Sequence, residues 1–312
     1  MTGGAGFIGS HLIDLLLAEG TWDVTVLDNY DPFYPRETKE RNLARHRGDP
    51  HLKIVEGDLR DAAALDACAE QPIDVIVHLA AKAGVRPSLE DPAGYVDNNV
   101  GGTQALLEAA HAWETPQFVF ASSSSVYGTD PNAPWNEDDC VLRPISPYAA
   151  TKVAGELLGH VYSHLYGLRF IGLRYFTVYG PRQRPDLAIH KFARLILEGQ
   201  PIPVYGDGTT SRDYTYVRDT VQATRAAMDY DATPYEIINL GNDRTVSLDR
   251  MISTLETSLG RRARRTSLPA QPGDVPHTWA DITRARELLG FEPSISFEAG
   301  VGLFAEWLLE EA

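Results

Sequence analysis

The sequence is poor in cysteine, in long apolar runs and in positive charge. Its 312 residues include two cysteines, Cys68 and Cys140, which excludes a disulfide framework and a cysteine-rich metal site. The longest apolar runs are far too short to span a membrane, and no signal-peptide pattern opens the chain. The 28 basic and 43 acidic side chains leave a net charge of −15, which argues against a protein that binds duplex nucleic acid. We therefore expect a cytoplasmic enzyme.

The first half of the chain alternates between short β-rich runs and helical patterns. Strands are expected at 22–28, 52–56, 73–79 and 118–122, and helices at 8–19, 62–69, 99–113 and 147–166. Nearly continuous apolar strands that alternate with helices predict an α/β fold with a doubly wound parallel sheet of the Rossmann type. Loops rich in proline and glycine follow. We therefore expect one domain over 1–173, with returning segments near 213–240, and a smaller, interleaved domain over 174–312.

Three glycines near the start of the chain form the pattern Gly3-x-x-Gly6-x-x-Gly9 in front of a predicted helix. Glycine permits a tight turn and lets backbone N–H groups approach a pyrophosphate, whose charge favours a helix N-terminus. Asp28 follows about 20 residues later, at the end of the next predicted strand. An acidic side chain there accepts a hydrogen bond from the ribose 2′-hydroxyl and repels a 2′-phosphate. The pattern therefore predicts a site for NAD in preference to NADP.

No strand precedes the glycine loop, although this strand lies at the centre of a doubly wound sheet. Its absence leaves backbone groups of the neighbouring strands without partners. Either the natural chain begins upstream of Met1 or the fold has lost its central strand. We expect the first alternative, because a strand that ends in valine would lead naturally into Thr2, and Met1 stands where that valine would be. A native mass equal to that of this chain would contradict the expectation.

The chemistry-bearing residues of the first half are a tyrosine, a lysine and a run of serines. Tyr148 and Lys152 share one face of a predicted helix at positions i and i+4. An ammonium group and a positive nicotinamide ring beside the phenol would favour the phenolate, which is a usable base. Ser122 to Ser125 follow a buried strand, at the edge where open α/β sheets bind ligands. Each of these patterns taken alone also occurs among surface residues and turn caps. The prediction of catalysis therefore depends on the joint occurrence and the order of the motifs.

These motifs resemble the extended short-chain dehydrogenase/reductase family, and in particular its NAD-dependent nucleotide-sugar epimerases and dehydratases, over nearly the whole chain. The matching segments are TGGAGFIGSHL, LDNYDPFY, EGDLRD, HLAAKAGVRPS, NNVGGT, SSSSVYG, SPYAATK, RYFTVYGPRQRPDLA, VYGDGTTSRDYTYVRD and QPGDVPHTWAD. The resemblance implies that 1–173 binds NAD and that 174–312 mainly binds a UDP-sugar. It also implies a homodimer that pairs through the helices at 99–113 and 147–166.

The resemblance assigns a role to each residue that matches a family motif. The catalytic residues are expected to be Ser123, Tyr148 and Lys152. Cofactor contacts are expected from Gly3, Gly6, Phe7, Ile8, Gly9, Asp28, Asn29, Asp58, Leu59, Leu79, Ala80, Ala81, Lys82, Asn99, Tyr148, Lys152 and Tyr175. Substrate contacts are expected from Arg86, Ser123, Ser124, Ser125, Thr177, Arg184, Lys191, Pro203, Tyr205, Arg212 and Asp274. No metal is expected.

Residues at a few positions narrow the choice among the substrate classes of the family. Ser124 and Ser125 stand where 4,6-dehydratases carry an Asp-Glu pair, and Ser125 also stands where UDP-glucuronate decarboxylases usually carry Glu. Thr177 and Gln271 replace the Asn and Arg that are common in UDP-galactose 4-epimerases. The remaining pattern is similar to UDP-glucuronate 4-epimerases. A UDP-glucose/UDP-galactose 4-epimerase is the first alternative, a UDP-glucuronate decarboxylase the second, and a catalytically silent NAD-binding regulator the alternative outside enzymes.

A glucuronate substrate adds a carboxylate that the site must hold. Guanidinium and hydroxyl groups are suitable donors, so we expect Arg184, together with Thr177 and the serine run, to bind it. Arg86 is a weaker second candidate, and a surface salt bridge is the alternative for Arg184. In the mechanism that the resemblance implies, Tyr148 removes the C4 hydroxyl proton, hydride passes to the nicotinamide, and the 4-keto sugar rotates before hydride returns to its opposite face.

Overall fold

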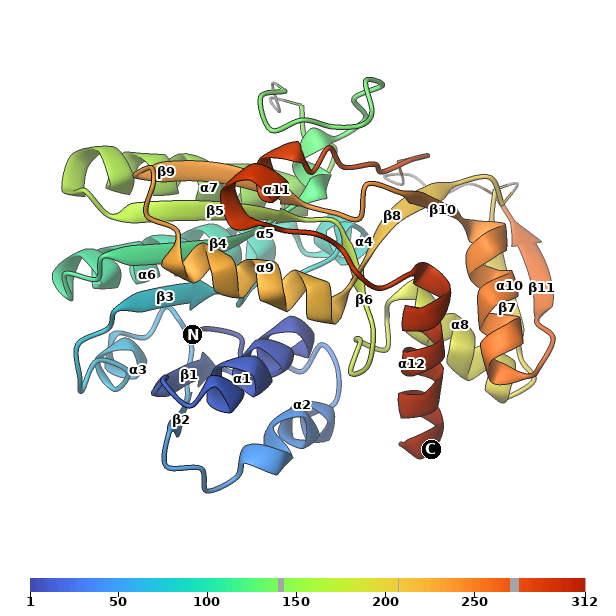
Figure 1. The fold of residues 1–312 in the computed structure, drawn as a ribbon, viewed down its shortest axis with the longest axis horizontal. Coiled ribbons are helices and arrows are strands. Elements are labelled where there is room, and N and C mark those ends of the chain that lie inside the picture. The colour runs from blue at the N-terminus through green and yellow to red at the C-terminus, as the bar shows by residue number, and fades with distance from the viewer. Residues whose placement is uncertain (140–142, 207, 270–274, 312) are drawn as a thin grey trace.

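The computed structural model describes residues 1–139, 143–206, 208–269 and 275–311. A twisted parallel sheet with helices on both faces forms its larger part (Figure 1). Its strands run in two blocks, β2-β1 and β3-β4-β5-β9, and every pairing within them is parallel. The predicted doubly wound sheet is therefore confirmed. The strands are β1 (Val24–Asp28), β2 (Leu52–Glu56), β3 (Val75–His78), β4 (Gln117–Ser123), β5 (Arg169–Tyr175) and β9 (Tyr235–Leu240).

Only Met1 and Thr2 occupy the central position between the two blocks. Thr2 forms parallel bridges to Leu27 of β1 and to His78 of β3. Its N–H donates to the carbonyl of Val77 at 2.9 Å, and the Met1 carbonyl accepts from the N–H of Leu27 at 2.9 Å. The strand that we expected to be missing is thus represented by two residues, which join the blocks into one sheet.

Helices cover both faces of the sheet. One face carries α1 (Phe7–Glu19) and α9 (Val217–Asp229), which pack on each other, and the opposite face carries α6 (Gly102–Ala112) and α7 (Pro147–Tyr166) (Figure 1). The shorter helices around the sheet are α2 (Arg36–Leu43), η1 (Ala44–His46), α3 (Ala62–Asp66), α4 (Val85–Glu90), α5 (Pro92–Tyr95), the π-helix η2 (Val96–Gly101), η3 (Ser124–Tyr127) and α11 (Thr283–Leu289).

The long helix α7 is fixed at its start and along its length. Pro147 stands in its first turn, and the Ser146 hydroxyl accepts the N–H of Ala149 at 3.1 Å, so the helix begins at the expected residue. Glycines let it lie close to the sheet: a Cβ on Gly155 would come within 2.3 Å of the Phe120 ring. The helix α7 therefore sits directly on β4.

The second half of the chain adds smaller sheets beside the carboxyl edge of the main sheet. One contains β6 (Thr177–Tyr179), β8 (Ser211–Tyr216) and β10 (Thr245–Ser247), and the other pairs β7 (Pro201–Tyr205) with β11 (Arg264–Leu268). Their helices are α8 (Ala188–Leu197), α10 (Leu248–Leu259) and α12 (Phe297–Glu310). Because β9 returns to the main sheet, the two halves are interleaved along the chain, while the division at residue 173 stays a prediction. Over the described ranges, the helices are too short or too polar to cross a bilayer.

Candidate active site

A cavity of about 870 Å³ lies along the carboxyl ends of the parallel strands. It brings together most of the predicted cofactor residues, the catalytic residues and part of the predicted substrate set. The predicted residues that line it are Gly3, Gly6, Phe7, Ile8, Gly9, Asp28, Asn29, Asp58, Leu59, Leu79, Ala80, Ala81, Lys82, Ser123, Ser124, Ser125, Tyr148, Lys152, Tyr175, Thr177, Arg184 and Arg212.

The other predicted cofactor residue, Asn99, lies behind the cavity wall. Its side-chain oxygen accepts the N–H of Lys82 at 2.8 Å, and its amide group donates to the Lys82 carbonyl at 2.9 Å and to Thr151 at 3.0 Å. Asn99 is buried and shapes the loop 80–82, whose residues face the cavity. Its role in this structure is therefore to hold the wall, and direct contact with the cofactor remains a prediction.

The remaining predicted substrate residues lie outside the cavity lining. Lys191 is exposed on α8. Pro203 and Tyr205 lie on β7, where the Arg86 guanidinium stands 5.1 Å from the centre of the Tyr205 ring. Arg86 and Tyr205 are thus brought together, as a pair that could border a nucleotide beyond the cavity. Asp274 lies outside the described residues, as does Gln271.

The glycine loop has the geometry that a dinucleotide requires. Gly3 adopts a φ of +70°, and a Cβ there would lie 2.8 Å from the backbone nitrogen of Ala80. The helix α1 begins at Phe7 without a hydrogen bond from a capping side chain, and its first residues, Phe7 to Gly9, line the cavity. An anion such as a pyrophosphate fits this arrangement, because it supplies acceptors to a helix N-terminus from which side chains are excluded.

Two carboxylates frame the end of the cavity next to β1 and β2. Asp28 is buried and accepts the N–H groups of Ala5 at 3.0 Å and of Tyr30 at 2.9 Å. These bonds fix its carboxylate beside the glycine loop, where a ribose would lie. Asp58 accepts from the Asn29 side chain at 3.2 Å and forms an ion pair with Arg60 at 2.8 Å, and the Arg60 hydrogen bonds hold the Asp58 pKa well below its usual range.

Ser123, Tyr148 and Lys152 meet where β4 ends against α7. The Tyr148 hydroxyl is hydrogen-bonded to Ser123, whose oxygen also accepts the hydroxyl of Ser125 at 2.9 Å. The Lys152 ammonium donates to the carbonyl of Ala121 at 2.7 Å and lies 5.9 Å from the centre of the Tyr148 ring. The predicted catalytic residues are therefore within reach of one bound substrate.

Burial dominates the electrostatics of this group. Burial raises the pKa of Tyr148, although the hydrogen bond to Ser123 and the positive charge of Arg184 act in the opposite direction. Burial also lowers the pKa of Lys152 to about 8. In the protein alone, burial therefore outweighs the groups that lower the tyrosine pKa, whereas the expected phenolate also depends on the charge of a bound nicotinamide and stays a prediction.

A buried charge pair that the sequence did not reveal supports the catalytic edge. Glu156, one turn after Lys152 on α7, accepts the Ser122 hydroxyl at 2.5 Å. Its two oxygens also bind the Arg174 guanidinium of β5, at 2.9 and 2.8 Å. Arg174 in turn donates to the Tyr127 hydroxyl at 2.8 Å. These contacts tie α7, β4 and β5 together directly behind Ser123.

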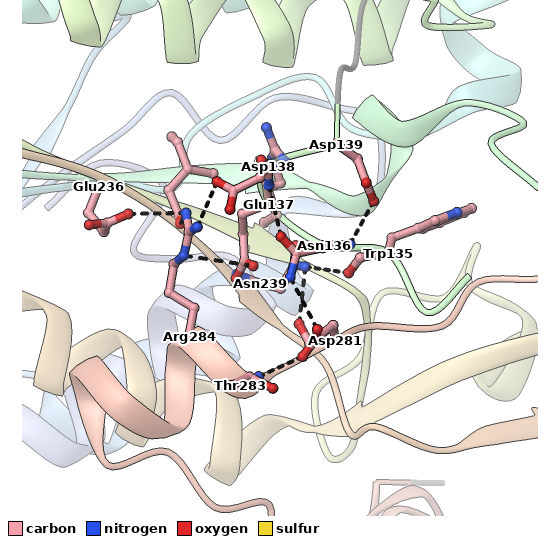
Figure 2. A network of polar contacts seen from close by, with 12 residues as sticks. Trp135, Asn136, Glu137, Asp138, Asp139, Glu236, Asn239, Asp281, Thr283 and Arg284 are labelled. Carbon is pink, nitrogen blue, oxygen red and sulfur yellow. Dashed lines mark hydrogen bonds and ion pairs between the residues drawn. The ribbon is translucent and has the colours of Figure 1, made fainter. Parts of the chain in front are cut away.

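A second polar network holds residues 135–139, which precede α7 in the chain (Figure 2). Asn239 at the end of β9 donates to the Trp135 carbonyl at 2.9 Å, and its N–H donates to Glu137 at 2.7 Å. Arg284 of α11 binds Asp138 in the same segment at 2.7 Å (Figure 2). Residues 135–139 are thereby anchored to both β9 and α11.

The substrate side of the cavity carries an arginine that is already paired. Arg184 forms two hydrogen bonds to Asp186, at 3.0 and 2.8 Å, and its guanidinium lies 5.4 Å from the centre of the Phe33 ring. Thr177 at the start of β6 lines the same cavity. Arg184 therefore forms the salt bridge that is the alternative to carboxylate binding, and it also lines the cavity.

Sequence reasoning missed several residues of the segment after Asp28. Phe33, Tyr34 and Lys39 line the cavity together with the glycine loop. Lys39 and its neighbour Asn42 are buried although both belong to a strongly polar helix, α2. The helix α2 therefore forms part of the site. Sequence periodicity gave no signal for this, because two of the three buried residues of α2 are polar.

The sheet, the glycine loop beside a carboxylate and the serine, tyrosine and lysine at one edge are the parts of a nicotinamide-dependent enzyme of the short-chain dehydrogenase type. The model of the "NAD dependent epimerase/dehydratase family" matches residues 1–241. The chain belongs to this family, and NAD is its cofactor. Within the family it is an NAD-dependent nucleotide-sugar epimerase.

Individual relatives are similar over their full length. The UDP-glucuronate 4-epimerase of Thermodesulfobacterium geofontis is 43% identical over 313 residues, which cover 99% of this chain and 95% of that protein. The structure of the UDP-glucuronic acid 4-epimerase of Bacillus cereus with UDP-glucuronic acid and NAD has a TM-score of 0.94 and 38% identity, covering 100% and 98% of the two chains. The UDP-glucose 4-epimerase of Thermotoga maritima with UDP-glucose has a TM-score of 0.91 and 32% identity, covering 99% and 98%.

Proposed function

We propose that the protein interconverts UDP-glucuronate and UDP-galacturonate by epimerisation at C4. The observation that carries this proposal is the position of Arg184. Its guanidinium lines the same cavity as Tyr148, and its charge is close enough to lower the tyrosine pKa. A sugar that presents C4 to Tyr148 can therefore present a C6 carboxylate to Arg184, which is a suitable bidentate partner. The names of the relatives from Thermodesulfobacterium geofontis and Bacillus cereus support the same substrate.

The residues around C4 perform proton transfer. NAD supplies the hydride chemistry when it is bound. Tyr148 accepts the proton of the C4 hydroxyl and returns it after the sugar has turned, and Ser123, which is already hydrogen-bonded to Tyr148, holds the C4 oxygen. Lys152 places a positive charge in the same buried pocket, where it would stabilise the negative charge that Tyr148 carries as a base.

The carboxylate contacts also serve as a chemical restraint. Oxidation at C4 of glucuronate produces a β-keto acid, which loses CO₂ when the bond to the carboxylate aligns with the carbonyl π system. Arg184, with hydroxyl donors from Thr177 and the serine run, would hold the carboxylate out of this alignment. The site then favours epimerisation over decarboxylation by orientation.

The test is to supply UDP-glucuronate and UDP-glucose separately and to identify the products by NMR. The proposal expects UDP-galacturonate from the first substrate and slow or no conversion of the second. Efficient conversion of UDP-glucose to UDP-galactose alone would favour the UDP-glucose/UDP-galactose epimerase. A UDP-pentose with released CO₂ would identify a decarboxylase, and bound NAD without any turnover would identify a regulator.

The sugar nucleotide is expected to extend from the catalytic residues toward the second half of the chain. Arg212 lines the cavity on this side, and the pair of Arg86 and Tyr205 lies beyond it. Arginines suit a diphosphate, and Tyr205 with Pro203 offers flat apolar surface to a uracil ring. The net charge of −15 is thus compatible with an anionic substrate because arginines gather at this site.

We also propose that two copies of the chain pair through α7. The outer face of this helix exposes Leu157 by 60%, Val161 by 44% and Leu165 by 60%. These residues recur every four positions and form an apolar stripe, which we call the leucine stripe. Analytical ultracentrifugation is expected to show a dimer and to show a monomer for Leu157→Glu combined with Leu165→Glu. A monomeric wild-type protein would contradict the proposal.

A further inference from the structure

Lys39 is a buried ammonium that has almost no polar partners. The residue is 6% exposed, and its nitrogen donates one hydrogen bond, to the Asp31 carbonyl at 2.9 Å. Over the ranges that the structure describes, it forms no other hydrogen bond and no ion pair. Its nitrogen lies 4.8 Å from the centre of the Tyr34 ring, which offers only a weak substitute for an anion. An ammonium has three donors, so this arrangement is costly unless something else completes it.

The helix that carries Lys39 packs against the glycine loop. Asn42, on the same buried face of α2, donates to the Ala5 carbonyl at 2.9 Å. The Tyr34 hydroxyl lies 3.8 Å from the position of a Cβ on Gly6. Lys39 and Tyr34 line the same cavity as Gly6 and the start of α1. We therefore place the remaining N–H donors of Lys39 in the part of the cavity in front of the glycine loop.

The other lysines of the cavity are engaged elsewhere. Lys82 forms an ion pair with Asp91 at 2.7 Å, and Lys152 is bound to the Ala121 carbonyl beside Tyr148. Arg184 is held by Asp186. Among the described lysines of the cavity, Lys39 is thus the one whose helix packs against the glycine loop and whose ammonium forms no ion pair.

We propose that Lys39 binds a phosphate oxygen of the cofactor diphosphate and is a cofactor-binding residue of this protein. A diphosphate in front of α1 would be held by backbone N–H groups on one side and by this ammonium on the other. The ribose hydroxyls are neutral and already have Asp28 as an acceptor, so they do not call for a cation. The proposal rests on NAD as the cofactor and is independent of which sugar is epimerised.

A buried lysine that binds the cofactor and a lysine that serves packing alone should respond differently to substitution. Burial lowers the pKa of Lys39, and the positive charge of Arg184 acts in the same direction, although the carboxylates of Asp28 and Asp31 oppose both. Removing the Lys39 charge is therefore expected to leave the cofactor-free protein at least as stable, and to reduce only the stabilisation that NAD provides. A lysine that served packing alone would show the opposite pattern.

The experiment compares Lys39→Met with Lys53→Met, which also removes one ammonium but lies on β2 and pairs with Glu70 at 2.8 Å. Calorimetry on cofactor-depleted protein measures the affinities for NAD, ADP-ribose and adenosine. For Lys39→Met we expect NAD and ADP-ribose to bind roughly 10- to 100-fold more weakly, since a charged hydrogen bond is lost, and adenosine to bind as before. Lys53→Met is expected to bind all three as the wild-type protein does.

Three results would overturn the proposal. Equal weakening of adenosine and NAD would place Lys39 on the nucleoside. A lower unfolding midpoint of Lys39→Met without NAD would assign a structural role. Unchanged affinities for NAD and ADP-ribose, with a raised KM for the UDP-sugar, would assign the lysine to the substrate. Because the binding arms contain no sugar nucleotide, they remain valid even if UDP-glucuronate is not the substrate.

Discussion

The two sides of the cavity are built from different kinds of contact. On the cofactor side, Asp28 is held by backbone N–H groups, Lys152 by a backbone carbonyl, and Glu156 by Arg174 in a buried pair. On the substrate side, Arg184 is held by Asp186, a neighbour two residues away at the edge of the cavity. The first set is fixed by the fold itself, whereas the second can exchange one carboxylate for another. Under the proposed function, the cofactor therefore meets side chains that the fold holds in place, and the substrate meets an arginine that can change its partner.

The largest effect is expected when the fixed side loses its proton carrier. Tyr148→Phe removes the hydroxyl that is hydrogen-bonded to Ser123 and is expected to lower kcat by about 10²- to 10⁴-fold. NAD content after purification should equal that of the wild-type protein, because the cofactor contacts of the glycine loop are untouched. Product NMR and the absorbance of released cofactor measure the two quantities. Turnover at the wild-type rate would show that another group carries the proton.

The buried pair behind the catalytic edge is expected to dominate stability. Glu156→Gln leaves the Arg174 guanidinium without its carboxylate in the interior, so the free energy of unfolding should fall by about 3–5 kcal/mol. Glu198→Gln is the matched control, because its pair with Arg194 at 3.6 Å is exposed and is expected to contribute at most about 1 kcal/mol. Chemical denaturation measures both changes. Equal losses would contradict the contrast between the buried and the exposed pair.

A substitution of Arg184 is expected to change the preference of the enzyme between UDP-glucuronate and UDP-glucose. Under the proposed function, Arg184→Gln should lower kcat/KM for UDP-glucuronate roughly 10- to 100-fold, because a charged hydrogen bond to the carboxylate is lost. The same variant should convert UDP-glucose at its original rate, however slow. Measuring both substrates in parallel separates a lost carboxylate contact from general damage. An equal loss for both would remove Arg184 from carboxylate recognition.

The smallest effect on kinetics is expected when Arg184 loses the carboxylate of Asp186. Asp186→Asn removes the carboxylate that holds Arg184, so a substrate carboxylate no longer has to displace it. Because the pair is partly exposed, the KM for UDP-glucuronate should fall by only about 2- to 5-fold, while kcat stays the same. Steady-state kinetics test this. A raised KM would show that Asp186 orients Arg184 for binding and does not compete with the substrate.

Residues that belong to local motifs could be predicted from the sequence. The glycine loop, Asp28, Ser123, Tyr148 and Lys152 were all placed in the cavity, because turn chemistry and helical spacing depend on near neighbours in the chain. The strand ends also followed from the rule that parallel strands present their carboxyl ends at one edge.

Residues whose role depends on distant partners could not be predicted in this way. Glu156 and Arg174 are ordinary charges on a helix and a strand until the sheet brings them together. Lys39 lies in a helix with few apolar residues, so no periodic pattern marked its buried face. The two-residue contribution of Met1 and Thr2 to the sheet is likewise too short for any propensity to indicate. The roles of these charged residues depend on spatial neighbours that are distant in the sequence.

The close seat of α7 on the sheet limits how the protein can be re-engineered. This helix presents Tyr148 and Lys152 inward and the leucine stripe outward, and Gly155 lets it rest against Phe120. A methyl group at Gly155 would have to push the helix away from β4, and Tyr148 would move with it away from Ser123. Substitutions on the outer face of α7 are therefore expected to affect pairing of two copies, whereas larger residues at its inner glycines are expected to affect the chemistry itself.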